Sequence, residues 1–308
     1  MSDSGLATRA GTTVSSPDRV PAPVRNAMTV DVEDYFHAEA LSACFPVDGW
    51  DLLESRVEAN VDQLLVLFAA AKVTATFFIL GWVAERYPRM VVAIADAGHE
   101  IASHGYNHRR VDRQQRFEFE EDIRRATAIL EDVSGQAIVG YRAPTFSITR
   151  NNFWAFDVLE NAGYRYSSSI FPIRHDNYGI HDAPRFPFHP PNSGIIEIPL
   201  TTTVRFGTNF PAAGGGYFRL LPYWLSQRNM KRVNRADKRP CVFYIHPWEI
   251  DPDQPRQHAV SRLSRWRHYT NLDVTKARLE RLLGEFRWGR MDHIFLDRAD
   301  EPADDDVE

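Results

Sequence analysis

The sequence has few cysteines and no long uninterrupted apolar run, and each shortage excludes a class of protein. Cys44 and Cys241 are the 2 cysteines among 308 residues. They lie far apart without Cys-x-x-Cys spacing, which argues against a disulfide framework or a cysteine-bound zinc. The most apolar span, residues 64–84, is divided by Lys72, so we expect a helix followed by a strand rather than a membrane span. Residues 1–26 lack the apolar stretch of a secretory signal peptide. They are expected to form a flexible leader, and the protein is expected to be cytoplasmic.

Charge of neither sign dominates. The chain has 36 Lys and Arg against 41 Asp and Glu, a formal charge of −5, and residues 297–308 form an acidic tail. A chain without a basic surplus is not an obvious partner for duplex nucleic acid, so no nucleic-acid partner is expected. The hydrophobic share of 44% and the charged share of 25% are ordinary for a globular protein. Residues 27–296 are therefore expected to form one packed domain.

Strand-like and helix-like segments alternate along this domain. The pattern predicts strands at 27–32, 73–80, 100–103, 138–141, 164–168, 195–199, 241–245 and 292–295, and helices at 56–71, 84–97, 117–133, 151–162, 222–234 and 274–286. About seven strand-then-helix units, with no GxGxxG after the first strand, favour an α/β fold. We expect a single distorted (β/α) barrel with about seven parallel strands, in which functional residues follow the C-terminal ends of the strands.

Three carboxylates, Asp31, Glu33 and Asp34, end the first expected strand. The alternation of side chains along a strand places Asp31 and Glu33 on one face. Crowded carboxylates repel each other unless a cation or an arginine compensates, so the pattern indicates a metal site or a general base. A solvated turn or a helix N-cap explains this segment equally well when it is taken alone.

Two histidines, His104 and His108, follow the expected strand at 100–103. Histidines four positions apart face the same way on a helical turn and can bind one ion. Such a pair arises easily by chance in a chain with 11 histidines, so its position at a strand end carries the argument. Two imidazoles and one carboxylate leave coordination positions open for water, as in catalytic zinc sites.

An arginine and a further histidine also follow strands. Arg142 comes after the strand at 138–141 and can pair with a strand-end carboxylate, although an ordinary surface arginine before the turn-forming Pro144 is also consistent. His246 comes after the strand at 241–245 and is available as a proton donor. A lone histidine in this position is often purely structural.

Taken in order, the segments Asp31–Asp34, Ser103–His108, Arg142–Pro144 and Ile245–His246 resemble the motifs of the NodB-like polysaccharide deacetylases, carbohydrate esterase family four. Asp-Val-Glu-Asp-Tyr-Phe, Gly-Gly-Gly-Tyr-Phe-Arg and His-Pro-Trp-Glu resemble the exosortase-associated branch, which is linked to bacterial exopolysaccharide production. This narrower likeness extends through a C-terminal family extension at about 250–296. The resemblance implies a hydrolase that removes N-acetyl groups from amino sugars of an exopolysaccharide or its lipid-linked precursor. It also implies an N-acetylated glycan as substrate and exopolysaccharide synthesis machinery at the membrane as a partner.

The resemblance further implies a divalent metal, most commonly zinc, with cobalt, manganese and nickel as alternatives. His104, His108 and one carboxylate would hold it. Adjacent aspartates of the family pattern are spaced out in this chain, so that carboxylate is Glu33 or Asp34, and strand parity favours Glu33.

The remaining roles also come from the resemblance. Asp31 would be the base, held by Arg142, and His246 would protonate the departing amine. A backbone N–H near Tyr141 to Ala143 would help to bind the oxyanion. The expected substrate contacts are Tyr141, Pro144 and Trp248.

One departure from the family pattern leaves alternatives open. Tyr-Ser-Ser-Ser at 166–169 stands where the family has Asp-x-x-Asp-Trp, so Glu249 or a hydroxyl would have to support His246. The alternatives are a hydrolase of C–N bonds in small amides and a catalytically silent glycan-binding subunit of a synthesis complex.

Three further features have both a functional and an ordinary explanation. Aromatic residues could stack on sugars or fill the core; they are Trp50, Trp82, Trp154, Trp224, Trp248 and Tyr217. The glycines at 214–216 could allow close approach to a polymer or form a simple loop. The basic segment with Arg256, Arg262, Arg265, Trp266, Arg267 and His268 could meet an anionic glycan or a lipid-carrier phosphate, or be a solvated face.

Overall fold

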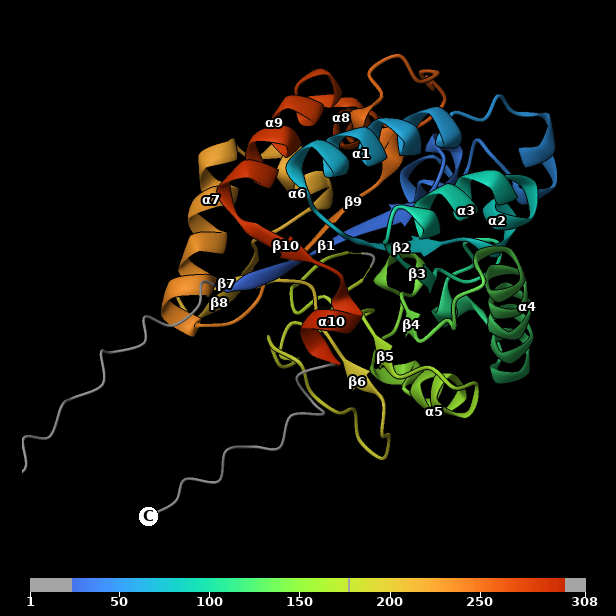
Figure 1. The fold of residues 1–308 in the computed structure, drawn as a ribbon, viewed down its shortest axis with the longest axis horizontal. Helices are drawn as coiled ribbons and strands as arrows, with labels where there is room; N and C mark the ends of the chain where they lie inside the picture. Colours follow the sequence, from blue (N-terminus) through green and yellow to red (C-terminus); the bar gives the residue numbers. More distant parts are fainter. Residues whose placement is uncertain (1–23, 177, 297–308) are drawn as a thin grey trace, which may run out of the picture.

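The computed structural model describes residues 24–176 and 178–296, and its centre is an eight-stranded sheet in which every strand pairing is parallel (Figure 1). The strands are β1 (Arg25–Val32), β2 (Thr76–Ile79), β3 (Glu100–Ser103), β4 (Gly140–Tyr141), β5 (Tyr166–Ser167), β6 (Ile196–Glu197), β9 (Val242–Ile245) and β10 (Arg287–Gly289). Strands β1 to β6 are neighbours in sequence order, and β9 and β10 both pair with β1. The α/β class and the distorted (β/α) barrel are therefore confirmed.

Strand β1 is the centre of this sheet. All of its residues except Arg25 are buried, as expected for a parallel strand covered on both faces. Ala27 is in register with both Val242 of β9 and Gly289 of β10, so these two strands lie on opposite edges of β1. The short strand β10 therefore shares an edge with β2.

The barrel closes between β6 and β9 without direct strand pairing. Thr201 spans this gap, because its hydroxyl accepts a hydrogen bond from the Val242 N–H at 2.6 Å and its carbonyl accepts one from the Ala212 N–H at 3.0 Å. A side chain thus replaces a ladder of backbone hydrogen bonds at this point, which makes the barrel irregular.

Helices cover the outside of the sheet (Figure 1). They are α1 (Val57–Ala71), α2 (Gly81–Arg86), α3 (Pro88–Asp96), α4 (Arg116–Ser134), α5 (Trp154–Asn161), α6 (Gly215–Leu220), α7 (Tyr223–Arg232), α8 (Arg262–Tyr269), α9 (Leu272–Glu285) and α10 (Met291–Phe295). Helix α4 buries Phe119, Ile123, Ala126 and Leu130, a spacing of three to four residues that turns one face toward the sheet. An antiparallel hairpin, β7 (Thr202–Arg205) and β8 (Thr208–Pro211), was not expected from the sequence.

Two predicted elements were wrong. The segment 292–295 belongs to helix α10 instead of a strand, and its strand, β10, lies upstream. The first N–H groups of α10 find side-chain acceptors, since Met291 donates to Thr76 Oγ1 at 2.8 Å and Asp292 donates to Glu100 at 3.2 Å. The single helix expected at 84–97 is divided into α2 and α3 because Pro88 has no N–H with which to continue a helix.

The segments expected to flank the domain lie mostly beyond the described residues. Strand β1 begins at Arg25, two residues before the expected position, and most of the expected leader and the whole acidic tail lie outside the described residues. Within the described part of the chain, no helix combines the length and the apolar character needed to cross a bilayer.

Candidate metal centre and active site

A cavity of about 200 Å³ lies where the C-terminal ends of the strands meet. Six of the residues predicted for the site line it: Asp31, Glu33, His104, His108, His246 and Trp248. They come from segments that follow β1, β3 and β9, so the parallel arrangement of these strands brings them together. Asp34, Tyr141 and Pro144 do not line this cavity, and Arg142 lies below it.

Glu33, His104 and His108 form a compact group of potential metal ligands. Glu33 Oε1 lies 2.9 Å from His108 Nε2 and 3.1 Å from His104 Nε2. His104 Nδ1 donates to the Arg142 carbonyl at 2.8 Å, because a carbonyl oxygen can only accept. In the neutral ring, Nε2 then carries a lone pair that faces the Glu33 carboxylate.

Two lone pairs at this distance repel each other unless a proton or a cation lies between them. The three ligand atoms lie within 4.8 Å of one another, and two imidazoles with one carboxylate are a donor set that suits zinc and related divalent ions. Burial raises the pKa of Glu33, but His108, His246 and His104 outweigh burial and bring this pKa well below its ordinary value. The residues present therefore fit a divalent cation.

The loop that carries the two histidines is not a helical turn, so the geometry expected from their spacing was wrong. Gly105 and His108 both have left-handed backbone angles, with φ of 77° and 56°. The N–H groups of Gly81 and Trp82, where α2 begins, donate to the carbonyls of Gly105 and Tyr106 at 2.9 and 2.8 Å. On the other side, Asp122 of α4 accepts the Tyr106 N–H at 2.9 Å. Two helices thus fix the loop, and the loop makes the histidines converge.

Asp34 is engaged elsewhere. Its Oδ2 accepts hydrogen bonds from the Ser55 hydroxyl at 2.7 Å and from the N–H groups of Arg56 and Val57 at 2.7 and 3.1 Å, and its Oδ1 accepts the Tyr35 N–H at 2.9 Å. Ser55, Arg56 and Val57 lie at the start of α1, whereas Tyr35 follows Asp34 directly. Of the two carboxylates that the sequence left open as ligands, Glu33 lies with the histidines and Asp34 caps backbone N–H groups.

Asp31 forms a fully buried ion pair with Arg142. Arg142 Nη1 lies 2.5 Å from Asp31 Oδ1 and 2.8 Å from Thr29 Oγ1. Its other nitrogens donate to Ser168, Nε to the carbonyl at 3.2 Å and Nη2 to the hydroxyl at 3.1 Å. The guanidinium also lies 4.1 Å from the centre of the Phe78 ring. Arg142 is therefore no surface arginine, and Ser168 of the serine run at 167–169 provides two acceptors for it.

His246 faces both carboxylates and is held from behind by a third. Its Nε2 lies 3.9 Å from Asp31 Oδ2 and 3.9 Å from Glu33 Oε1. Its Nδ1 lies 3.1 Å from Glu249 Oε2, and Arg219 Nε donates to Glu249 Oε1 at 2.7 Å. Glu249, one of the two supports considered from the sequence, thus orients the ring.

The charges around His246 favour its protonated form. Burial lowers the pKa of His246, but Glu33, Glu249 and Asp31 outweigh it and raise this pKa to about 9. Burial raises the pKa of Glu249, whereas Arg219 and His246 bring it down to about 2. Sequence reasoning gave Arg219 no role. The Gly-Gly-Gly-Tyr-Phe-Arg segment was the only feature that marked it, because the contact joins α6 to a residue 30 positions away.

The residues expected to contact the substrate differ in whether they reach the cavity. Trp248 lines the cavity and stacks between His246 and His268, with ring centres 5.1 and 4.4 Å apart. The Tyr141 ring is instead buried against Phe119 and Tyr164, at 5.7 and 5.8 Å.

The oxyanion donors expected near Tyr141 to Ala143 already have acceptors. The Arg142 N–H donates to the Ser103 carbonyl at 2.9 Å, and the Ala143 N–H donates to Ser169 Oγ at 2.9 Å. Pro144, the third expected substrate contact, is buried and does not line the cavity. Neither of these N–H groups is therefore free to face a substrate.

The other sequence features differ in their position relative to the metal-ligand group. A side chain at Gly214 would meet the Tyr244 backbone at 2.4 Å, so the glycine run allows close approach of this chain to itself. Trp50 and Trp82 pack in the core, whereas Trp224 is exposed. Arg267 lines the cavity, while Arg256, Arg262, Arg265 and Trp266 line a separate surface depression.

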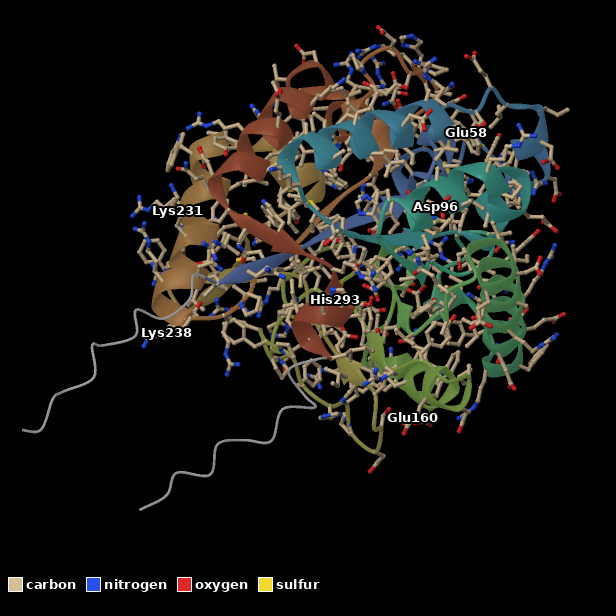
Figure 2. The ribbon with its side chains drawn as sticks, in the orientation of Figure 1. Glu58, Asp96, Glu160, Lys231, Lys238 and His293 are labelled. Carbon is tan, nitrogen blue, oxygen red and sulfur yellow. The ribbon has the colours of Figure 1, made fainter. Side chains whose placement is uncertain are left out.

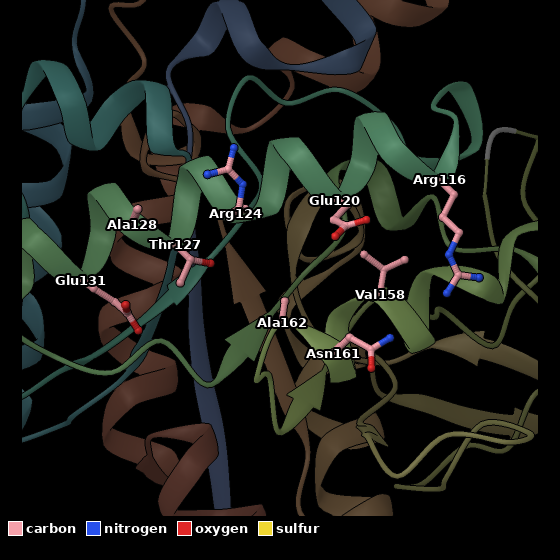
Figure 3. Close-up of a pocket in the computed structure, with 9 residues that line it drawn as sticks. All are labelled: Arg116, Glu120, Arg124, Thr127, Ala128, Glu131, Val158, Asn161 and Ala162. Carbon is pink, nitrogen blue, oxygen red and sulfur yellow. The ribbon is translucent and has the colours of Figure 1, made fainter.

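A larger depression of about 390 Å³ lies between α4 and α5 (Figure 3). Its side chains carry charges of both signs, including Arg116, Arg124, Glu120 and Glu131, and none of the predicted site residues reaches it. No set of reactive groups converges there, so we assign no chemistry to it.

Two family models match this chain. Residues 48–167 match the polysaccharide deacetylase family, and residues 168–296 match a domain of unknown function, DUF3473. Each of these two matches covers less than half of the chain. The barrel and the site use both matched regions, because His104, His108 and Arg142 lie in the first and Arg219, His246 and Glu249 lie in the second. Asp31 and Glu33 precede both.

Two curated relatives resemble parts of this chain. A peptidoglycan deacetylase from Helicobacter pylori is 29% identical over 118 residues, 37% of this chain and 38% of that protein. A peptidoglycan-N-acetylglucosamine deacetylase from Bacillus cereus is 37% identical over 84 residues, 27% of this chain and 30% of that protein. The similarity thus spans about a third of the length of each relative.

Solved structures share the fold. A protein from Mycobacterium smegmatis assigned to the polysaccharide deacetylases has a TM-score of 0.57 at 20% identity, covering 93% of each chain. An allantoinase has a TM-score of 0.54 at 16% identity, covering 88% of each chain. Since both glycan and small-amide enzymes have this barrel, the fold alone does not select the substrate.

Proposed function

We propose that this protein is a metal-dependent hydrolase that removes N-acetyl groups from the amino sugars of a polysaccharide. The observation that carries the proposal is the convergence, in one cavity, of the Glu33, His104 and His108 group, the buried Asp31–Arg142 pair and the His246–Glu249 pair. The names of the sequence relatives support an acetylated glycan as the substrate.

The residues of the chain have complementary roles in this reaction. Glu33, His104 and His108 would hold a divalent ion, which when bound would supply a Lewis acid and lower the pKa of water. Asp31 accepts a proton from the attacking water through Oδ2, because Arg142 engages Oδ1. His246 donates a proton to the departing amine as the C–N bond breaks. The products are acetate and a free amino sugar. The proton that Asp31 takes from water balances the proton that His246 gives to the amine.

The substrate is proposed more narrowly as a bacterial exopolysaccharide or its lipid-linked precursor. Support comes from the segments that resemble the exosortase-associated branch, together with the match of the C-terminal region to a separate family. On this proposal the enzyme works beside exopolysaccharide synthesis machinery, with zinc as the expected metal and cobalt, manganese or nickel as substitutes.

The decisive experiment measures acetate release from N-acetylglucosamine oligomers by metal-stripped protein, with and without each of these ions. We expect release only after metal is restored. His104→Ala should lose both bound metal and acetate release, whereas Asp31→Asn should keep the metal and lose turnover. His293→Ala, an exposed histidine on α10, is the matched control and should behave as wild type.

The alternatives give different results in the same assay. Tight oligosaccharide binding without acetate release under any metal would identify a silent glycan-binding subunit. Hydrolysis of a ureide or cyclic imide without release from the oligomers would identify a small-amide hydrolase. Full activity in His104→Ala would overturn the proposed metal centre.

A further inference from the structure

Helix α7 exposes a stripe of cations that the proposed function does not use. Trp224, Arg228, Lys231, Arg232 and Arg235 follow one another at helical spacing along α7 and the π-helical turn after it. The opposite face of this segment is buried and contains Ser226, Asn229, Met230 and Val233. The stripe therefore faces away from the barrel.

These cations are not neutralised by neighbours. Within the described residues, Arg228, Lys231, Arg232, Arg235 and Lys238 form no ion pair with a carboxylate. The acid of this segment, Asp237, pairs with Arg185 at 3.0 Å. A positive surface thus exists on a chain whose formal charge is −5. Figure 2 shows Lys231 and Lys238 along the α7 edge, while Glu58, Asp96 and Glu160 lie over other parts of the molecule.

Exposed aromatic side chains accompany the cations. Phe206, at the tip of the β7–β8 hairpin, is 104% exposed, Trp224 is 57% exposed and Phe210 is 44% exposed. The hairpin is tied to α7, because Arg205 donates to Asn229 Oδ1 at 3.0 Å. A fully exposed phenylalanine beside a basic helix is typical of a surface with an apolar partner. We call these three aromatic residues and the five cations the basic aromatic surface.

This surface lies at the opposite end of β1 from the cavity. Asn234, in the π-helical turn, exchanges hydrogen bonds with Asn26 at the start of β1, whereas Asp31 and Glu33 lie at the end of the strand. An eight-residue strand spans about 26 Å. Figure 1 shows α7 and the hairpin at the end where β1 begins.

We propose that the basic aromatic surface docks the protein onto an anionic lipid bilayer, with the cavity facing away from the lipid. Cations attract anionic headgroups, and aromatic rings insert at the level of the headgroups. A soluble polyanion would satisfy the cations, but it would leave the projecting Phe206 in water. The proposal rests on this surface alone and is independent of the enzymatic activity.

The test is co-sedimentation of the full chain with vesicles of phosphatidylcholine alone and of phosphatidylcholine with phosphatidylglycerol. We expect binding to the anionic vesicles that weakens with added salt. Arg232→Glu/Arg235→Glu should reduce the vesicle partition at least tenfold, since each cation near the surface contributes about a fivefold factor. Phe206→Ser should reduce it severalfold.

Matched controls carry the same changes elsewhere. Arg89→Glu/Arg124→Glu alters the charge equally on α3 and α4, and Phe117→Ser removes another exposed aromatic side chain; both should bind as wild type. Equal binding to neutral vesicles, equal loss in the controls, or no loss in Arg232→Glu/Arg235→Glu would overturn the proposal. So would unchanged binding by Phe206→Ser together with full displacement by soluble single-stranded DNA, which would identify a general polyanion surface. Acetate release from soluble oligomers should be unaffected in all these variants, so a failure of docking is distinct from a failure of catalysis.

Discussion

At the scale of residues, Arg142 links the metal-ligand group to the proposed base. Its carbonyl accepts the Nδ1 proton of His104 and so turns the Nε2 lone pair of that ring toward Glu33. Its guanidinium holds Asp31 Oδ1. One buried residue thus sets the tautomer of a ligand and the orientation of a carboxylate. The two functions are separable by mutation, because the first belongs to the backbone and the second to the side chain.

Replacement of this guanidinium should therefore affect turnover without affecting the metal. In Arg142→Lys, a single ammonium replaces a planar fork that contacts Asp31, Thr29 and Ser168. We expect kcat to fall about a hundredfold, the scale seen when one well-placed electrostatic donor is removed, while metal content measured by atomic emission stays at the wild-type level. Arg124→Lys, at an exposed arginine, should change neither. Loss of metal in Arg142→Lys would show that the side chain also maintains the ligand group.

The contact between His246 and Glu249 predicts a shift in the pH dependence of the reaction. The negative charge of Glu249 contributes to raising the pKa of His246, and the reaction needs the protonated ring. In Glu249→Gln this pKa falls, so activity should be lost at lower pH than in wild type. We expect the alkaline limb of the kcat profile to move down by about one pH unit. An unmoved alkaline limb would mean that another group is the acid.

At the scale of elements, the sequence was informative wherever a local pattern determines the structure. The strand ends could be located because apolar runs stop at Asp31, His104 and His246, and parallel strands bring such ends together. Contacts between elements that are distant in the sequence could not be predicted in this way. To predict the pairing of Arg219 with Glu249, one must know that α6 packs beside β9. To predict that Thr201 joins β6 to β9, one must know where the sheet curls.

Short segments were the other source of error. The stretch at 292–295 has too few residues for a period of 2 to be told from a period of 3.6, and side-chain acceptors on β2 and β3 decide in favour of a helix. The loop from His104 to His108 depends on two left-handed residues and on contacts with α2 and α4, none of which the spacing of the histidines reveals.

The glycine run before α6 offers a test of how that element is positioned. Gly214 has φ of 97°, and a Cβ there would lie 2.4 Å from the Tyr244 carbonyl oxygen, whereas a Cβ at Gly216 would meet nothing closer than Arg219 Nη2 at 3.9 Å. Gly214→Ala should destabilise the protein by about 2 kcal/mol or more and should lower kcat, since Tyr244 lies on the strand that ends at His246. Gly216→Ala is the matched control and should unfold at or slightly above the wild-type temperature. Equal stability of the two variants would contradict the close packing of Gly214 on β9.

At the scale of the whole molecule, carboxyl groups in the barrel and beneath the helices that cover it resist ionisation. Burial raises the pKa of Glu197 to about 7, that of Glu100 to about 7 and that of Asp122 to about 6. Glu197 is fully buried; its Oε1 accepts the N–H groups of Ser169 and Ile170, at 2.9 and 2.7 Å. It thereby supports the segment that follows Ser168, the serine that holds Arg142.

These raised pKa values make the folded protein less stable as the pH rises. Between about pH 4.5 and 7 the folded state keeps a proton on Glu197 that the unfolded chain has released, so the free energy of unfolding falls with pH across this window. In Glu197→Gln this dependence is removed. The amide oxygen still accepts both N–H groups, and any cost of burying the amide is independent of pH. We therefore expect the melting temperature of Glu197→Gln, relative to wild type, to increase from pH 5 to about pH 7 and then to level off toward pH 8. Glu58→Gln, at an exposed position on α1, should follow the wild-type curve; parallel curves for Glu197→Gln and wild type would mean that Glu197 is ionised in the folded protein throughout this range.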